Sequence, residues 1–207
     1  LVGQGSFVQP LTLFNGEDVT RASAGVSYTV AVPEPDAATL LIVGLAPGYH
    51  GANRSGRPFT GDYAGVLLYS TLHRFGFASR PHSVSADDGL ELTGCRITNA
   101  VKCVPPENKP TPEEIRTCRT FMAAELAEMA RLRAIVTLGK IAHDSVIAAL
   151  GGKPSACKFA HGARHDLAHN GTDAGMGARG VAVFDSYHCS RLNTNTGLPR
   201  HSTVRSS

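Results

Sequence analysis

The sequence predicts an α/β fold with three layers, α/β/α, built around a central and mostly parallel four-stranded sheet. Two observations lead to this prediction: strand-length apolar segments alternate with segments of helical periodicity, and the first strand is apolar on both faces. A chain of 207 residues with 42% hydrophobic residues is long enough for one such core. We expect residues 1–207 to form a single domain, with 1–35 as an irregular lead-in and 198–207 as a flexible tail.

Four short apolar segments are the expected strands: Thr39–Leu45, Cys95–Val101, Ala134–Leu138 and Val181–Phe184. Three segments with helical spacing lie between them: Val66–Phe75, Thr111 to about Ala130, and Ile141–Leu150. The second helix opens on Thr-Pro-Glu-Glu, which combines an N-cap, a proline in the first turn and a capping-box glutamate. Loops 46–65, 99–110 and 186–197 each follow a strand, so they should meet at the carboxyl edge of the sheet.

Charge alone says little about a partner, because 20 Lys and Arg against 17 Asp and Glu leave a net charge of only +3. Its distribution says more: residues 186–207 contain Arg191, Arg200 and Arg205 and no acidic residue. Arginine favours phosphate contacts, although a solvated, arginine-rich tail is an equal alternative. No apolar run is long enough to span a membrane and no secretion signal opens the chain, so we expect a cytoplasmic location.

The first loop is rich in glycine but fits neither the dinucleotide-binding nor the P-loop pattern. Its glycines would let the backbone approach an anion or a flat base, and Phe59 offers a stacking face. Asp62 is its single carboxylate, and a lone aspartate after glycine is more typical of a turn or helix cap than of a catalyst.

The second and third loops carry groups that can read or polarise a base. Asn99 lies at a strand end, where its amide could read a base edge or satisfy local backbone. His188 could donate to a developing anion, although a lone histidine is more often structural. The histidines at 161, 165 and 169 have the spacing of a metal face on a helix, but Gly162 and the surrounding residues argue against zinc.

Five cysteines form an odd set without a CxxC pair, which argues against a closed disulfide framework. Reduced thiols or metal ligands remain. Cys103 and Cys118, taken alone, are best interpreted as two buried reduced thiols.

Taken together, the loop motifs resemble the uracil-DNA glycosylase superfamily, in particular its iron–sulfur family 5 type. The motifs are GLAPGYHGANRSGRPFTGDYAG, ITNAVKCVPPENKPTPEEIRTC, LGKIAHD, FAHG and SYHCSRLNTNTG, in this order between about Leu40 and Gly197. The resemblance implies the glycosylase fold and a DNA repair enzyme that hydrolyses the N-glycosidic bond of uracil in base excision repair. Such an enzyme leaves an abasic site, and other deaminated bases are further candidate substrates.

The resemblance also assigns roles to residues. Phe59 would stack on the extruded base, Asn99 would bind its edge, and His188 would donate to the uracil carbonyl as the base leaves. Leu45 stands where related families carry a water-positioning residue, so Asp62 is the candidate for placing water or supporting the sugar cation. The expected catalytic residues are therefore Asp62 and His188. The expected substrate-binding residues are Gly44, Ala46, Gly48, Asn53, Phe59, Asn99, Ser190, Arg191, Leu192 and Asn193.

A [4Fe-4S] cluster is implied by the family, held by an N-terminal cysteine pair together with the positions of Cys103 and Cys118. This chain has no cysteine before Cys95, so either the cluster is absent or the sequence lacks its beginning. Two further departures are Cys189, where many relatives have proline, and an end at Gly197–Ser207 that stops short of the family's usual helix.

We expect a monofunctional, monomeric glycosylase acting on double-stranded DNA that contains uracil, without membrane association. Neither Lys102 nor Lys109 is favoured as a Schiff-base lysine. Two alternatives remain open: a catalytically silent DNA-binding relative and a nucleoside or nucleotide hydrolase.

Overall fold

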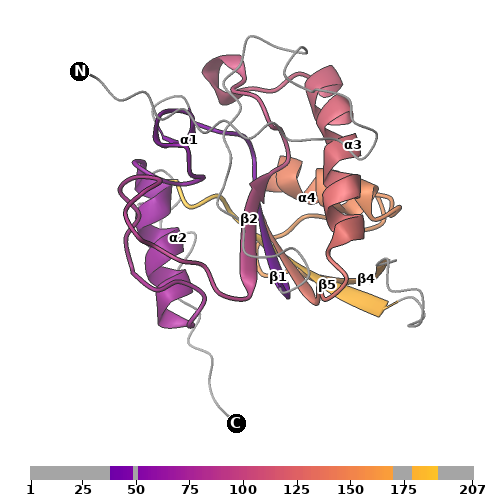
Figure 1. The fold of residues 1–207 in the computed structure, drawn as a ribbon. Coiled ribbons are helices and arrows are strands. Elements are labelled where there is room, and N and C mark those ends of the chain that lie inside the picture. Colours follow the sequence, from indigo (N-terminus) through magenta and orange to yellow (C-terminus); the bar gives the residue numbers. More distant parts are fainter. Residues whose placement is uncertain (1–37, 49–50, 170–178, 191–207) are drawn as a thin grey trace.

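One five-stranded sheet forms the centre of the molecule, with the strand order β2-β1-β3-β5-β4 (Figure 1). A computed structural model describes residues 38–48, 51–169 and 179–190. The strands are β1 (Leu40–Gly44), β2 (Cys95–Asn99), β3 (Ala134–Leu138), β4 (Arg164–His169) and β5 (Arg179–Ser186). β1, β2, β3 and β5 pair in parallel, as predicted.

The prediction of four strands was wrong by one, because β4 pairs antiparallel with β5 at the edge of the sheet. Along β4 exposed residues alternate with less exposed ones, as on a half-covered edge strand. Its sequence RHDLAH lacks the apolar character that marks the other strands. The histidine spacing in this region is therefore not that of a helix face.

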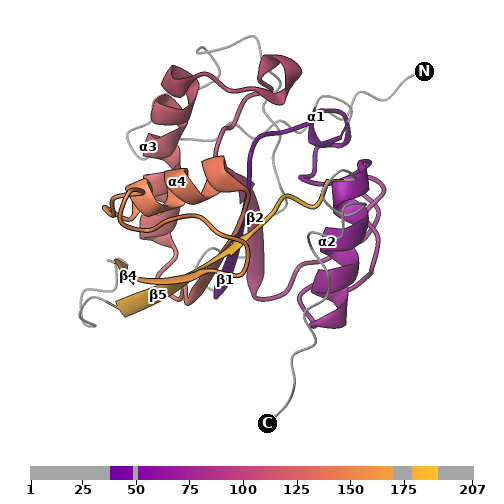
Figure 2. The same cartoon turned by 180° about the vertical axis from the view of Figure 1, so that it is seen from behind.

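Helices cover both faces of the sheet and complete the predicted three layers. The helical elements are α1 (Ala52–Ser55), α2 (Tyr63–Arg74), a short 3-10 helix at Pro106–Asn108, α3 (Pro112–Glu128) and α4 (Lys140–Ala149). Figures 1 and 2 show α2 on one face and α3 with α4 on the other. The capping box that opens α3 is present, with the Thr111 hydroxyl and the Glu114 side chain each bonding the other's backbone N–H.

Strand residues alternate between two apolar cores. Leu41 and Val43 face the core shared with α3 and α4, whereas Ile42 faces the core shared with α2. This alternation fixes the register of β1 and therefore the height at which its last residue, Gly44, meets the loops.

Several predictions fall on residues outside the described part of the chain. They concern the lead-in 1–35, the tail 198–207 and three binding residues: Arg191, Leu192 and Asn193. Within the described residues, no helix combines the length and apolar character needed to cross a bilayer.

Candidate active site

The carboxyl edge of the parallel sheet gathers the predicted loops. β1 and β2 end side by side, with Gly44 opposite Asn99, and the next amide, that of Ala100, donates to the Gly44 carbonyl at 2.9 Å. β3 and β5 end in register as well, and the Gly139 N–H donates to the Ser186 carbonyl at 2.8 Å. The loops after β1, β2 and β5 therefore begin from one line of strand ends.

Phe59 packs edge-on against the end of β1. An ideal Cβ placed on Gly44 would lie 2.6 Å from Cζ of Phe59 and closer still to Oδ1 of Asn99. Glycine at position 44 thus lets the ring of Phe59 and the amide of Asn99 approach one backbone site. The predicted stacking face and base-reading amide lie together, as expected.

Phe59 adopts a left-handed backbone conformation with φ of 55°, which is strained for a side chain of this size. Its carbonyl oxygen occupies the space that a Cβ on Gly65 would need. The hydroxyl of Tyr69 donates to the neighbouring carbonyl of Pro58 at 2.8 Å. Helix α2 therefore holds the backbone of this turn through the Tyr69 side chain and the close approach at Gly65.

Arg57 anchors the same turn from the other side. Its buried guanidinium donates to Oδ1 of Asp88 at 2.6 Å, to the Ala86 carbonyl at 2.6 Å and to the Ser83 hydroxyl at 3.0 Å. Burial alone would raise the pKa of Asp88, but Arg57 and the backbone N–H groups around it outweigh burial and hold that pKa well below its usual range. The turn that carries Phe59 is thus tied to residues 83–90 by a buried ion pair.

Asp62 is the N-cap of α2, since its Oδ1 accepts from the Gly65 N–H at 2.9 Å. Its second oxygen faces the turn at Gly48 and Gly51, where a Cβ on Gly51 would lie 2.8 Å from Oδ2. The cap interpretation is therefore confirmed. A cap uses only one oxygen, and the other lies toward the first loop.

His188 lies half-buried at the same edge, with its ring centroid 6.0 Å from that of Phe59. Burial lowers the pKa of His188, and the negative charge of Asp62 offsets part of that shift. The two predicted catalytic residues are therefore close enough to interact electrostatically. Burial also raises the pKa of the neighbouring Cys189 to about 11, with a further contribution from Asp62.

Next to Asn99 along the chain, Thr98 belongs to a buried charge cluster at the end of β2. Oε2 of Glu125 on α3 accepts from Lys102 at 3.0 Å and from the Thr98 hydroxyl at 3.1 Å, and its Oε1 pairs with Arg96 at 2.7 Å. Burial would raise the pKa of Glu125, but the two cations lower it below its usual value. Lys102 is thus held in an ion pair.

The remaining predicted binding residues lie along the first and third loops. Ala46 and Gly48 follow β1, and Asn53 lies in α1 with its backbone N–H bonded to the Gly48 carbonyl at 3.1 Å. Ser190 is half-buried and follows Cys189. These positions agree with a loop that lines the edge, and their roles remain predictions.

Cys103 and Cys118 lie near one another, as an implied cluster would need. Burial, followed by Cys118 and Glu114, raises the pKa of the Cys103 thiol, and the Lys102 N–H contacts Sγ of Cys118 at 3.4 Å. The other three cysteines lie elsewhere: Cys95 in the α2 core, Cys157 beside α4 and Cys189 at the strand edge. Two thiols do not meet the four-thiolate requirement of a cubane cluster, so the residues of this chain alone do not fit one.

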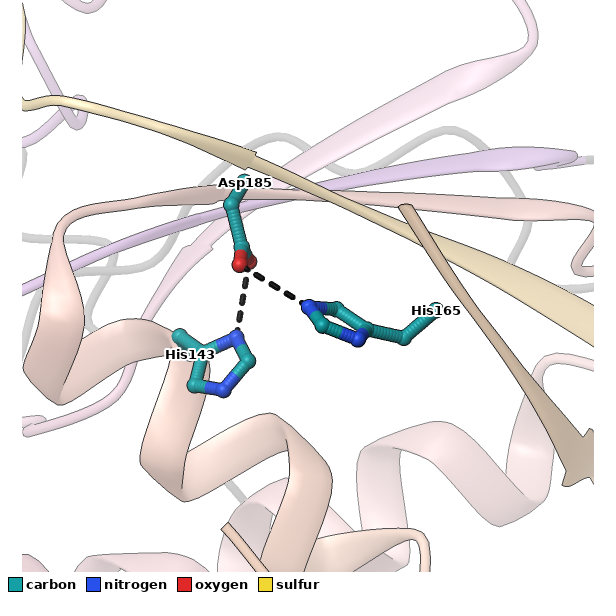
Figure 3. Close-up of side chains that lie close together, drawn as sticks. All are labelled: His143, His165 and Asp185. Carbon is teal, nitrogen blue, oxygen red and sulfur yellow. Dashed lines mark hydrogen bonds and ion pairs between the residues drawn. The ribbon is translucent and has the colours of Figure 1, made fainter. Parts of the chain in front are cut away.

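Sequence reasoning missed a cluster of three side chains, of which His143 on α4 and Asp185 on β5 are buried and His165 on β4 is partly exposed (Figure 3). Oδ1 of Asp185 accepts from His143 at 2.7 Å, and Oδ2 accepts from His165 at 3.1 Å. The other two histidines of the 161–169 series face elsewhere, His161 on Tyr187 and His169 on the Met129 carbonyl.

The donor set of this cluster favours hydrogen bonds over a metal ion. Besides the two histidines, Oδ1 of Asp185 accepts from the Thr137 hydroxyl at 2.9 Å and Oδ2 from the Ala160 N–H at 3.3 Å. Four donors use the lone pairs that a metal ion would need. No single sequence motif contains these residues, so spacing could not have revealed them.

The fold and its edge define a class of protein: a mostly parallel α/β fold whose strand ends bring together an aromatic ring, an amide and a histidine that lies within the electrostatic influence of a carboxylate. The profile of the Uracil DNA glycosylase superfamily matches residues 32–205. The chain belongs to this superfamily.

Individual relatives support the same assignment. A Type-5 uracil-DNA glycosylase of Thermus thermophilus is 47% identical over 160 residues, covering 77% of this chain and 68% of the relative. Type-5 enzymes of Pyrobaculum aerophilum and Mycobacterium tuberculosis are 44% and 45% identical, with 77% and 76% of this chain covered. The matches span 65% and 56% of those two relatives.

Proposed function

We propose that this chain is a monofunctional uracil-DNA glycosylase that hydrolyses the bond between uracil and deoxyribose and leaves an abasic site. The observation that carries the proposal is the meeting of Phe59, Asn99 and His188 at one strand edge, beside the carboxylate of Asp62. The similarity to enzymes named uracil-DNA glycosylases gives the substrate.

The geometry supports a mechanism in which the site first binds the edge of the base and then polarises its carbonyl. A base that has left the duplex stacks on Phe59, while the Asn99 amide, fixed at the end of β2, offers donor and acceptor atoms to its edge. Because burial favours the neutral form of His188, its ring N–H donates to the carbonyl that gains negative charge. Such a donor helps more in the transition state than in the ground state.

Asp62 acts on the sugar side of the bond. Its Oδ1 is committed to the cap of α2, and Oδ2 remains for an attacking water or for the positive charge on the sugar. The carboxylate also stands near enough to His188 to affect its pKa. The His188 donor thus stabilises the negative charge on the leaving base, and the Asp62 carboxylate stabilises the positive charge on the sugar.

The direct test is release of uracil from a labelled duplex with one uracil, followed by alkali to reveal abasic sites. We expect His188→Ala to lower the single-turnover rate by roughly 100 to 1,000-fold. Borohydride should trap no covalent adduct, since Lys102 is held by Glu125. A trapped adduct would contradict the monofunctional mechanism, and no release by folded protein would favour a catalytically silent DNA-binding relative.

A pair of variants separates the two roles of Asp62. Asp62→Asn keeps a side chain that caps helices well but removes the charge, whereas Asp62→Ala removes both. We expect both variants to lose activity and only Asp62→Ala to lose about 1 kcal/mol of stability. Thr111→Ala is the matched control, because it removes the cap of α3, a helix cap that involves none of the proposed site residues.

The partner we propose is duplex DNA, bound by a monomer that acts as a single domain. Competition by undamaged duplex, with little effect from free nucleosides, would distinguish this function from that of a nucleoside or nucleotide hydrolase. Deaminated bases other than uracil are tested in the same assay. Binding of an iron–sulfur cluster through Cys103 and Cys118 would require ligands besides this chain's other described cysteines.

A further inference from the structure

Asp185 is the next-to-last residue of β5, three residues before His188, and is joined to four other segments. Its buried carboxylate accepts hydrogen bonds from Thr137 on β3, His143 on α4, Ala160 in the loop before β4, and His165 on β4. Figure 3 shows the two rings approaching the carboxylate from different elements. A single side chain therefore fixes the carboxyl end of β5 relative to its surroundings.

The backbone beyond Asp185 is held at each step toward His188. The Gly162 N–H donates to the Asp185 carbonyl at 2.8 Å, and the Gly139 N–H donates to the Ser186 carbonyl at 2.8 Å. The Tyr187 N–H donates to Nδ1 of His161 at 3.3 Å, and the two rings stack with centroids 5.0 Å apart and an interplanar angle of 12°. The position of His188 is thus the end point of an anchored segment.

Hydrogen bonds also hold both ring nitrogens of His143. Both ring nitrogens of His143 face atoms that only accept, Oδ1 of Asp185 and the Cys157 carbonyl, each at 2.7 Å. A buried ion pair need not stabilise a fold, because apolar residues in its place often stabilise it as much. Its hydrogen bonds do fix the orientation of the side chains that make them.

We propose that Asp185, with His143 and His165, positions His188 for donation to the leaving base. This inference rests on the proposed glycosylase function but concerns residues that do not touch the substrate. Because a displacement of about 1 Å at a catalytic group costs on the order of 100-fold in rate, losing this anchor should lower the rate of uracil release by roughly 10 to 100-fold. Affinity for duplex DNA should stay unchanged.

The test compares three variants with a control on β4, the strand that carries His165. Asp185→Asn replaces the central carboxylate of the cluster with an amide. His165→Leu removes one hydrogen-bond donor to that carboxylate, and His165→Gln restores an N–H donor toward Oδ2. His169→Gln is the control: His169 is a second histidine of β4 and bonds the Met129 carbonyl, but it pairs near the opposite end of β5. Each protein is measured for single-turnover uracil release, duplex affinity, thermal stability and the NMR signal of the His188 ring.

The expected result is a slower rate and a shifted His188 signal in Asp185→Asn and His165→Leu, with recovery in His165→Gln and no change in His169→Gln. The inference is overturned if the rate and the His188 signal stay at wild-type values, or change equally in the control. If Asp185→Asn does not fold, the two His165 variants decide. If the unaltered protein releases no uracil, the proposed function fails, and the His188 signal still decides whether the cluster positions that ring.

Discussion

Gly44→Ala is the sharpest test of how the site is assembled, because it adds one methyl group where the base-binding side chains meet. The new Cβ would lie 2.6 Å from Cζ of Phe59, about 0.8 Å short of ordinary van der Waals contact. The Asn99 amide would have to move as well. Overpacking of this kind costs roughly 1–3 kcal/mol, and a shift of about 1 Å in the reading groups costs on the order of 100-fold in rate.

The assay is single-turnover release of uracil from a duplex, measured together with the melting temperature. Gly152→Ala is the matched control, since its Cβ would lie 3.0 Å from Cγ2 of Ile147, beyond the end of α4. We expect the control to lose stability without a comparable loss of rate. Wild-type rate and stability in Gly44→Ala would refute the packing argument, and equal loss of rate in the control would refute its link to the site.

The remaining predictions follow from the electrostatics. Because burial lowers the pKa of His188 below its ordinary value of about 6.5, the ring is mostly neutral above pH 6.5, and the rate of uracil release should stay level from pH 6.5 to pH 8. A fall in the rate over this range of a pH–rate profile would contradict a neutral donor. Arg57→Met should lower the free energy of unfolding by about 3 kcal/mol, measured by denaturant titration, since it leaves the buried Asp88 carboxylate without its cation. In the unaltered protein the stability that Asp88 contributes is complete above about pH 4 and is lost as the pH falls, because its folded pKa lies below the unfolded one. Since burial raises the pKa of Cys189 to about 11 and that of Cys95 to about 12, neither thiol should react with iodoacetamide at pH 8 until the protein unfolds, as read by mass spectrometry; rapid labelling of the folded protein would refute their burial.

Much of the fold could be predicted because its elements carry local signals. The strand at 134–138 was predicted with its observed bounds, and the start of α3 was predicted from its capping box. β4 was missed because edge strands need fewer apolar residues, and because its regularly spaced histidines drew attention to a helical period.

Site residues could be predicted where a polar side chain follows a strand end, since few roles suit it there. They could not be predicted where the role of the residue arises from tertiary packing. Asn99 and His188 could be placed at the edge from the order of strands and loops. The cluster around Asp185 could not be predicted, because His143 precedes Asp185 by 42 residues and no sequence motif contains both residues. The left-handed conformation of Phe59 could likewise not be predicted from the sequence, since phenylalanine rarely adopts it.

The strand order also determines when in folding the site can exist. Leu40 pairs with Cys95 on one side and Ala134 on the other, so each parallel contact closes a long loop, whereas β4 and β5 are near neighbours in the sequence. Loop closure of this kind is slow and costs entropy before any contact is gained. Phe59, Asn99 and His188 come from three of these distant segments. A partly folded chain therefore holds at most part of the site, and recovery of activity during refolding should report the last pairing of the sheet.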